Sequence, residues 1–169
     1  MCRILITGGK GFIANSLSKL LSYDNISLGK EELNLLNREE IIAALHTYKP
    51  DIIVHSATYD AAPQFSTNSK EKVLEFNLRM FYNLASLDYL YDRLIYFGSG
   101  SEYGRDFWYP KMKEDDIGKN IPSDSYGFSK YIMNAHAINN LKIINLRLFT
   151  VYGEFDDWRY RLVSNLCVK

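Results

Sequence analysis

The sequence predicts an α/β fold, a doubly wound parallel sheet of about five strands with helices on both faces. Two observations lead to this fold class. Short apolar runs alternate with segments of helical periodicity, and a glycine-rich turn follows the first apolar run. The 169 residues suit one domain with its own core, and no repeat, low-complexity tract or linker divides them.

Composition excludes several classes of function. The chain is 47% hydrophobic and 24% charged, with 20 basic and 20 acidic residues, so it lacks the electrostatic footprint of a protein that binds nucleic acid or an acidic membrane. No run approaches the roughly 18 apolar residues of a membrane span, and we expect no signal peptide. Cys2 and Cys167 are expected to be free thiols of a cytoplasmic protein, and no residue spacing favours a metal site.

The first half of the chain predicts two strands and two helices. Arg3–Thr7 is a short apolar run followed by glycines, which is typical of a buried strand, and apolar side chains recur at helical spacing over 11–22. A second, shorter strand is predicted over 25–28. The amphipathic pattern of 38–48 predicts a helix that stops just before Pro50, because the residue preceding a proline disfavours helical geometry.

The second half continues the alternation. The apolar runs 51–56 and 93–97 predict the third and fourth strands, and a long helix is predicted between them over about 69–91. A long loop is expected over 103–123.

The last three elements follow that loop. A helix is predicted over 124–139, with Ser123 or Asp124 as its N-cap, because both side chains can accept a backbone N–H. The apolar run 142–148 predicts a fifth strand. A final, incomplete helix is predicted over 157–168.

The glycine-rich turn lies between the first strand and its helix. Small residues at Gly8, Gly11 and Ala14 permit a tight turn, close approach of a pyrophosphate, and close packing of helix on sheet. The N–H groups at the start of the helix would bind the phosphates. We therefore expect a dinucleotide here, beside Gly8, Gly11, Phe12 and Ile13.

Tyr126 and Lys130 lie four residues apart on the predicted helix over 124–139, so the phenol and the ammonium share one helix face. A free tyrosine has a pKa near ~10 and is a poor base at neutral pH, whereas a nearby cation favours the phenolate. The spacing alone is also common on solvated helix faces. Its occurrence downstream of the glycine-rich turn favours a proton-transfer centre.

Together, the turn T-G-x-x-G-x-x-A and the downstream Y-x-x-x-K resemble the extended short-chain dehydrogenase/reductases, the NAD-dependent epimerase/dehydratase family acting on nucleotide sugars. The resemblance implies a Rossmann-like fold and extends along the chain. Asp51–Ala57 is similar to the family's third strand, whose end, here Ser56 and Ala57, passes the cofactor ribose. Asn77 matches an asparagine on the family's long helix, and Arg147–Gly153 matches the end of its fifth strand.

The resemblance implies redox chemistry at a sugar carbon. Tyr126 would act as general acid or base, while Lys130 would lower the pKa of the Tyr126 phenol and hold the nicotinamide ribose. Ser99 matches the serine or threonine that hydrogen-bonds the reacting oxygen, and Asn77 matches the asparagine that supports the water relay of the lysine. The implied substrate contacts are Ser99, Ser101 and Thr150.

The cofactor is expected to be NADP or NAD, with NADP preferred. The segment after the second strand resembles GDP-fucose synthases, which have a basic residue at the position of Lys30, and a cation there suits the 2′-phosphate of NADP. Alternatively, Lys30 is a solvated loop residue, and Glu31 or Glu32 binds the ribose hydroxyls of NAD. By the same match, Asn34 should lie beside the adenine.

The loop after the fourth strand narrows the reaction. Gly100 and Ser101 replace the acid pair of sugar 4,6-dehydratases, and Ser101 also replaces the epimerising cysteine of GDP-fucose synthases. Redox chemistry at one carbon remains, as in a 4-epimerase or a 4-ketoreductase. Glu102 stands at a usually apolar position for no evident physical reason, and His55 is expected to be structural. The aromatic residues within 103–109 either pack under the loop or stack on a base.

The resemblance covers the N-terminal part of such enzymes, so we expect the C-terminal substrate lobe to be absent from this chain. The expected partners are a nucleotide-sugar substrate and a second copy of the chain, which would bind through the long helix and the helix of Tyr126 and Lys130. Neither nucleic acid nor a membrane is expected as a partner. Two other functions stay open, a non-catalytic NAD(P)-binding module and a reductase of a non-sugar carbonyl.

Overall fold

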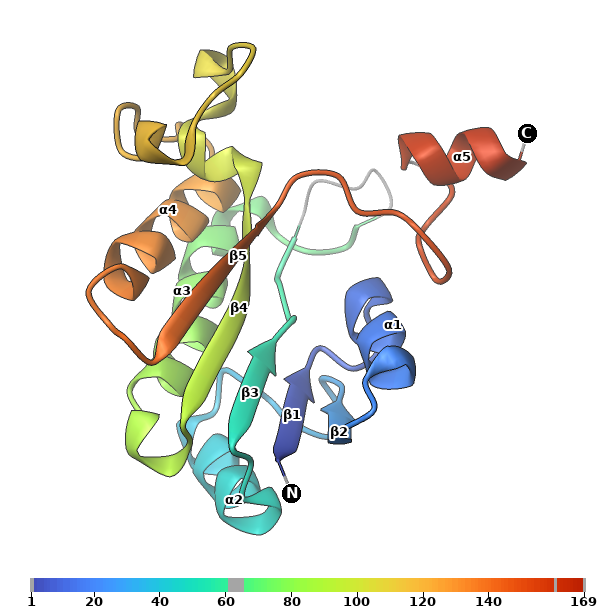
Figure 1. Cartoon of the computed structure of the whole chain (residues 1–169), viewed down its shortest axis with the longest axis vertical. Coiled ribbons are helices and arrows are strands. Elements are labelled where there is room, and N and C mark those ends of the chain that lie inside the picture. Colours follow the sequence, from blue (N-terminus) through green and yellow to red (C-terminus); the bar gives the residue numbers. More distant parts are fainter. Residues whose placement is uncertain (1, 61–65, 160, 169) are drawn as a thin grey trace.

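The computed structural model describes residues 2–60, 66–159 and 161–168 and contains the predicted parallel sheet (Figure 1). Its strands lie in the order β2-β1-β3-β4-β5, and every pairing is parallel. This is a doubly wound order whose switch point lies between β1 and β3, the place where such sheets bind ligands. The strands are β1 (Arg3–Thr7), β2 (Asp24–Leu28), β3 (Ile52–His55), β4 (Arg93–Ser99) and β5 (Ile143–Leu148).

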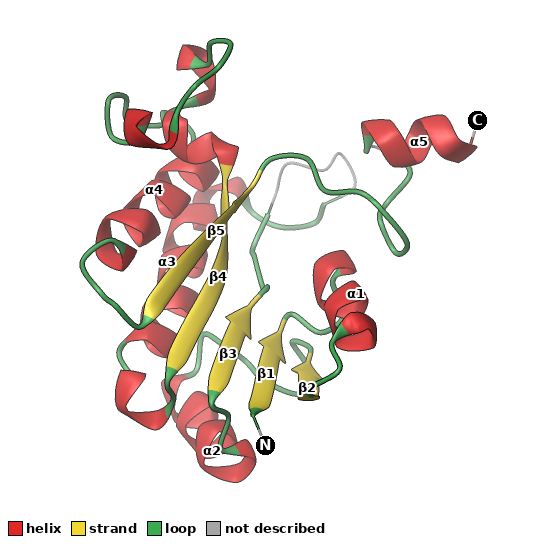
Figure 2. Cartoon of the chain, viewed as in Figure 1, coloured by secondary structure: helices red, strands yellow, loops and turns green. Residues whose placement is uncertain are grey.

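Helices cover both faces of the sheet (Figure 2). On one face pack α2 (Arg38–Tyr48), α3 (Val73–Ala85) and α4 (Ser125–Ala137), and on the other packs α1 (Phe12–Leu20). The last helix, α5 (Leu162–Val168), lies apart from the sheet. In the described part of the chain, no helix is both long and apolar enough to cross a membrane.

The core forms on both sides of the sheet because neighbouring side chains of a strand point to opposite faces. In β1, Leu5 belongs to the larger cluster under α2, α3 and α4, whereas Ile4 and Ile6 pack with Ala14 of α1. In the larger cluster the fully buried Phe81 meets Tyr96 edge to face, with ring centroids 5.1 Å apart. Burial on both faces explains why these strands are nearly continuous apolar runs.

Side-chain caps fix the start of two helices. The Asn37 Oδ1 atom accepts the Glu39 N–H at 3.1 Å at the start of α2, whose bounds match the predicted helix over 38–48. At the start of α4, Asp124 Oδ1 accepts the Gly127 N–H at 2.8 Å. Asp124, rather than Ser123, is therefore the N-cap of α4.

The predicted helix over 69–91 is wrong in its length, because α3 covers only its central part. Leu87 and Tyr91 are buried beyond the end of α3. Their apolar side chains continue the helical spacing of the sequence, although the helix itself has ended. There the Tyr91 hydroxyl donates to the Leu84 carbonyl at 2.9 Å. Separate 3₁₀ turns flank α3 at Lys70–Lys72 and Asp88–Leu90.

Other boundaries also differ from the predictions. The strand predicted over 93–97 continues to Ser99, so Ser99 is the last residue of β4. The helix predicted over 157–168 begins only at Leu162, because Asp157 accepts the Arg159 N–H at 3.1 Å in a local turn. The predicted loop and its approach contain short 3₁₀ turns at Gly100–Tyr103, Arg105–Phe107 and Glu114–Asp116.

Candidate functional site

The glycine-rich turn lies at the switch point between β1 and β3. Gly8 has a φ of +75°, and a Cβ there would lie 2.8 Å from the backbone of Ala57, so this close approach requires glycine. The Gly11 N–H donates to the Gly8 carbonyl at 2.8 Å, and the Gly9 N–H donates to the Leu28 carbonyl at 2.8 Å. The turn is thereby held between the ends of β2 and β3, and Gly11 leads directly into α1.

A cavity of about 450 Å³ opens beside this turn. Side chains of Leu33, Leu35, Phe76 and Met80 give it apolar walls, and a few polar groups stand among them. Such a mixture is typical of small-molecule sites. The predicted cofactor residues that line this cavity are Gly8, Gly11, Lys30, Asn34, Ser56 and Ala57.

Two lysines and two glutamates stand near the edge of this first cavity. The exposed Lys10 ammonium forms an ion pair with Glu31 Oε2 at 2.7 Å. The Glu32 carboxylate accepts the Gly29 N–H at 2.8 Å. Both glutamates therefore already have partners within the chain, and the Lys30 side chain is exposed at the cavity.

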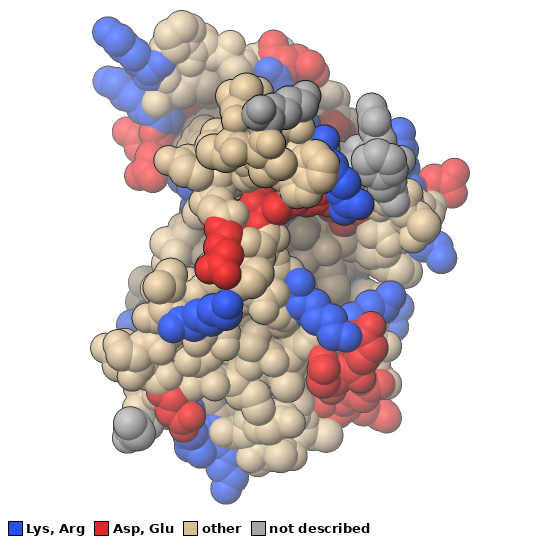
Figure 3. Space-filling view, turned by 90° about the vertical axis from the view of Figure 1, so that its right-hand side faces the viewer, with Lys and Arg blue, Asp and Glu red and all other residues tan. Residues whose placement is uncertain are grey.

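A second cavity of about 320 Å³ lies at the carboxyl ends of β3, β4 and β5, and it shares Ser56 and Thr58 with the first cavity. On the face shown in Figure 3, basic and acidic side chains are interspersed around a hollow. Phe149 and Val151 line the second cavity, whereas Thr150 between them is exposed and is not part of the lining. Besides Ser56, the predicted residues that line this cavity are Phe12, Ile13, Ser99, Ser101, Tyr126 and Lys130.

Asn77 supports the segment that lies between the two cavities. Its Nδ2 donates to the Tyr59 carbonyl and its Oδ1 accepts the Tyr59 N–H, both at 2.8 Å. The Thr58 hydroxyl donates to the same Oδ1 at 3.3 Å. The structure therefore places Asn77 behind the chain that follows β3, and its hydrogen bonds go there rather than to Lys130.

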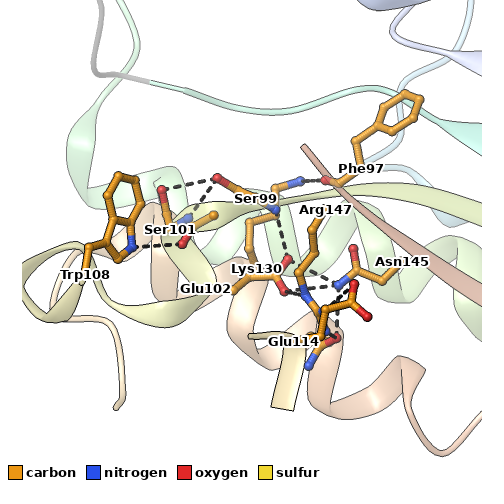
Figure 4. A network of polar contacts seen from close by, with 11 residues as sticks. Phe97, Ser99, Ser101, Glu102, Trp108, Glu114, Lys130, Asn145 and Arg147 are labelled. Carbon is orange, nitrogen blue, oxygen red and sulfur yellow. Dashed lines mark hydrogen bonds and ion pairs between the residues drawn. The ribbon is translucent and has the colours of Figure 1, made fainter. Parts of the chain in front are cut away.

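Lys130 reaches from α4 to the end of β4. Its Nζ donates to the Phe97 carbonyl oxygen at 2.8 Å, and the residue is buried (Figure 4). Burial lowers the pKa of Lys130 to about 8, and the negative charge of Glu102 opposes that shift. The ammonium lies 5.8 Å from the ring centroid of Tyr126, and both residues line the second cavity.

The pKa of the Tyr126 phenol is shifted in the direction opposite to the predicted one. Burial raises the pKa of its phenol, and a hydrogen bond with the Ser99 side chain opposes this shift. Lys130 is not among the main influences on this pKa, and its ammonium instead donates to the Phe97 carbonyl. The chain's own groups therefore raise the pKa of Tyr126, and the lowering predicted for Lys130 stays a prediction. They hold the phenol in its protonated form, which can donate a proton.

Polar groups of the loop after β4 complete the wall beside Tyr126. The Ser99 hydroxyl donates to Ser101 Oγ at 3.2 Å, and the Ser101 N–H donates to Ser99 Oγ at 3.1 Å. Arg105 Nε donates to Ser101 Oγ at 2.9 Å. The indole N–H of Trp108 donates to the Gly100 carbonyl at 3.2 Å, and this half-exposed ring lines the cavity.

Glu102 has a structural explanation that sequence reasoning missed. Its side chain is fully buried, and Arg147 Nε donates to its Oε2 at 2.8 Å (Figure 4). The Arg147 guanidinium also lies 5.7 Å from the ring centroid of the buried Tyr103, which packs under the loop. Glu102 and Arg147 are 45 positions apart, so no local pattern predicts their ion pair. The signals that could have indicated it are a glutamate at a usually apolar position and an arginine within a strand.

His55 fits the structural role predicted for it. Its Nδ1 lies 2.9 Å from the Thr7 hydroxyl oxygen, and its ring is buried. Burial lowers the pKa of His55 to about 3, with a further contribution from the charge of Lys130. Among the described residues no group of His, Cys, Asp and Glu could hold a metal ion, and both Cys2 and Cys167 are free.

The chain is similar to known proteins along most of its length. Residues 4–167 match the family described as NAD dependent epimerase/dehydratase. A dTDP-4-dehydrorhamnose reductase of Aggregatibacter actinomycetemcomitans is 30% identical over 166 residues, which cover 92% of this chain and 53% of the relative. Methionine adenosyltransferase 2 subunit beta of Pongo abelii is 27% identical over 165 residues, which cover 91% of this chain and 48% of the relative.

A solved structure shows the same fold. The GDP-mannoheptose C4 reductase of Campylobacter jejuni with NADP bound superposes with a TM-score of 0.79 at 20% identity. The match covers 93% of this chain and 54% of that chain. The chain therefore spans about half the length of the relatives it matches.

We expect His55 to make the stability of the chain pH-dependent. Folded His55 takes up a proton only near pH 3, whereas an unfolded histidine does so near ~6.5, so acidification through this window favours the unfolded chain. Between pH 7 and pH 5 the wild-type chain should lose roughly 2 kcal/mol more free energy of unfolding than a His55→Gln variant. Urea denaturation at both pH values measures the difference.

The control for this prediction is His46→Gln, at an exposed position of α2, which should retain the wild-type loss. An equal loss of stability in His55→Gln and wild type would contradict the prediction.

Proposed function

Because this chain belongs to the NAD dependent epimerase/dehydratase family, we propose that the protein is an NAD(P)-dependent enzyme that reduces or epimerises one carbon of a nucleotide sugar. The observation that carries this proposal is the presence of Tyr126, Ser99 and Lys130 around one cavity beside the glycine-rich turn. Two relatives are named as reductases of nucleotide sugars, which favours reduction.

The residues at the switch point fit a dinucleotide. Gly8 brings the turn against Ala57 where a Cβ would not fit, and the start of α1 offers backbone N–H groups to a pyrophosphate. The first cavity continues from there to Lys30 and Asn34, which suits a ribose and an adenine. When bound, NAD(P) supplies the hydride donor or acceptor of the reaction.

In the proposed reduction, Tyr126 gives its phenolic proton to the sugar carbonyl oxygen as that oxygen becomes a hydroxyl. The raised pKa of the buried phenol suits this acid role. Ser99 donates a hydrogen bond to the same oxygen, and the Lys130 ammonium places positive charge beside it. In an epimerase the same groups would act in both directions, and Tyr126 would have to start as a phenolate to accept the proton of the sugar hydroxyl.

We propose NADP as the preferred cofactor. In an NAD enzyme Glu31 or Glu32 would have to bind the ribose hydroxyls, yet Glu31 is paired with Lys10 and Glu32 holds a backbone N–H. Lys30 and Lys10 both line the first cavity, but Lys10 is paired with Glu31, so Lys30 is the cation proposed to bind the cofactor. A lysine at this position favours a 2′-phosphate. The presence of NADP in the solved C4 reductase supports the same choice.

One observation favours a second function. The chain is also similar to methionine adenosyltransferase 2 subunit beta, whose name describes a subunit of a larger assembly. A non-catalytic NAD(P)-binding subunit would use the first cavity without proton transfer in the second. Reduction of a non-sugar carbonyl is the third candidate, since fold kinship does not fix a substrate.

Tyr126→Phe tests the proposed acid. The turnover of NADPH with dTDP-4-dehydrorhamnose as the first probe should fall by about 10²–10⁴-fold, because the ring is kept and only the proton donor is lost. NADPH affinity should stay nearly unchanged. Absorbance of NADPH follows the first quantity, and fluorescence titration follows the second.

Tyr131→Phe, at a half-buried position of the same helix, is the matched control and should retain turnover. Wild-type turnover in Tyr126→Phe would show that another group supplies the proton. Tight NADPH binding by the wild type, with no turnover on a panel of nucleotide 4-keto sugars, would favour the subunit.

Lys30→Glu tests the cofactor preference. NADPH affinity should weaken by about 10- to 100-fold, because a charge-assisted contact to the 2′-phosphate is replaced by repulsion, while NADH affinity should change little. Titration of both cofactors measures the preference. Lys111→Glu makes the same change of charge at an exposed position of the 103–123 loop and should leave both affinities unaltered. An unchanged NADPH preference in Lys30→Glu would remove Lys30 as its determinant.

We also propose that the protein forms a homodimer through α3 and α4. These helices pack together, and Tyr82 of α3, which is 37% exposed, meets the ring of His136 of α4 at 5.2 Å between centroids. Sedimentation equilibrium should give twice the 19.6 kDa mass of the chain, and Tyr82→Glu should give the monomer. Tyr89→Glu, exposed outside both helices, should remain dimeric. A monomeric wild type would refute the interface.

A further inference from the structure

Glu102 carries a fully buried carboxylate in the 3₁₀ turn that follows Ser99. Gly98 provides the space for this carboxylate, because a Cβ there would collide with Glu102 Oε1 and Asn145 Oδ1. Burying a charge is costly unless it is paired and hydrogen-bonded. An apolar residue could fill the same space without that cost, so packing alone does not account for Glu102.

The carboxylate connects the end of β4 to β5 (Figure 4). Glu102 Oε1 accepts the backbone N–H of Ser99 at 3.0 Å. Its Oε2 accepts Arg147 Nε at 2.8 Å and Asn145 Nδ2 at 3.1 Å, and both of these residues belong to β5. Three donors from two elements thus converge on a single carboxylate, which is the arrangement that makes a buried charge tolerable.

The same network extends to α4. Asn134 Oδ1 accepts Arg147 Nη2 at 2.8 Å and Asn145 Nδ2 at 3.0 Å. Asn134 is buried on α4 and lies four residues after Lys130, on the same side of the helix. The network therefore joins the loop of Ser99 to the helix that carries Tyr126 and Lys130.

We propose that Glu102 is a positioning residue of the candidate reductase site and acts through Ser99 and Lys130. Its carboxylate fixes the main chain of Ser99 against β5 and α4, and its charge stabilises the buried ammonium of Lys130. This inference rests on the function proposed above, because Ser99 and Lys130 are the groups that Glu102 positions.

Three elements carry the ionisable groups that interact with Lys130, and Asp60, Arg105, Asp124 and Arg161 line the second cavity with it. Tyr126 lies on the same helix, with its ring centroid 5.8 Å from Nζ, and His55 at the end of β3 is buried and neutral. Burial raises the pKa of Glu102, but the Ser99 N–H and Arg147, whose guanidinium stays charged at any ordinary pH, oppose that shift, so Glu102 is the anion among these three. Its charge raises the pKa of Lys130 against the effect of burial.

Glu102→Gln tests the inference in the full chain by two NMR readouts. The pKa of Lys130 is followed on ¹³C-labelled lysine, with its signal assigned by its loss in Lys130→Arg. It should fall below its wild-type value of about 8, because the variant lacks the anion that opposes burial. The Ser99 amide resonance should also move, because its N–H loses a charged acceptor.

Glu114→Gln is the matched control. Glu114 lies 3.8 Å from Nη1 of the same arginine, but its side chain is 92% exposed, so both readouts should keep their wild-type values. A folded Glu102→Gln chain with an unchanged Lys130 pKa and an unchanged Ser99 amide would overturn the proposal.

Glu102→Gln leaves Arg147 without its carboxylate, and the variant could fail to fold for that reason. A second variant is designed for that case. In the double variant Glu102→Gln with Arg147→Met, the arginine that would be left without its carboxylate is also removed. The Lys130 pKa should still fall, because Glu102 and not Arg147 is a main influence on it. Wild-type values of both readouts in the folded double variant would overturn the proposal.

NADPH titration of the wild type separates this inference from the proposed function. If the wild type does not bind NADPH, the proposed function fails, whereas the two NMR readouts still report whether Glu102 acts on Ser99 and Lys130. If NADPH binds and neither readout responds to Glu102→Gln, only the positioning role fails.

Discussion

The carboxyl end of β4 is the part of the molecule on which the candidate site depends. Three consecutive residues there have separate tasks: the Phe97 carbonyl accepts the Lys130 ammonium, Gly98 leaves room for Glu102, and the Ser99 N–H binds that glutamate. Parallel pairing with β3 and β5 sets their register. Because neighbouring residues of a strand face opposite sides, a shift of one residue would disrupt all three contacts at once.

Burial that orders this site also determines its acid–base chemistry. It disfavours charge, so the pKa of the Tyr126 phenol is raised and that of the Lys130 ammonium falls to about 8. The hydrogen bond with Ser99 moderates the first shift and the charge of Glu102 moderates the second. The chain therefore holds a protonated phenol beside a lysine that still carries its charge at neutral pH, a combination that suits donation of a proton to a carbonyl oxygen.

Sequence reasoning predicted the features that depend on residues close together in the chain. It missed the features that depend on contacts between residues far apart in the chain. The alternation of apolar runs predicted the parallel sheet, and local chemistry predicted the Gly8 turn and limited the N-cap of α4 to Ser123 or Asp124, of which Asp124 is the cap. The predicted length of α3 was wrong because apolar residues buried beyond its end continue the helical spacing of the sequence. The partners of Glu102 and Asn77 lie 45 and 18 positions away in the chain, and no local pattern reveals such pairs.

The two cavities lie at different strands of the sheet, and in the proposed enzyme this separation indicates where substrate choice would arise. The first is built on the ends of β1, β2 and β3, and the groups that would move a proton stand at the second, on β4 and α4. Ser56 and Thr58 belong to both, so a ligand that extends from one to the other passes the end of β3. The rest of the second cavity includes Arg105, Trp108 and Phe149, which follow β4 and β5 in connecting segments. Such segments vary most freely without disturbing a sheet, so in the proposed enzyme discrimination among substrates could change there while the proposed proton-transfer groups stay in place.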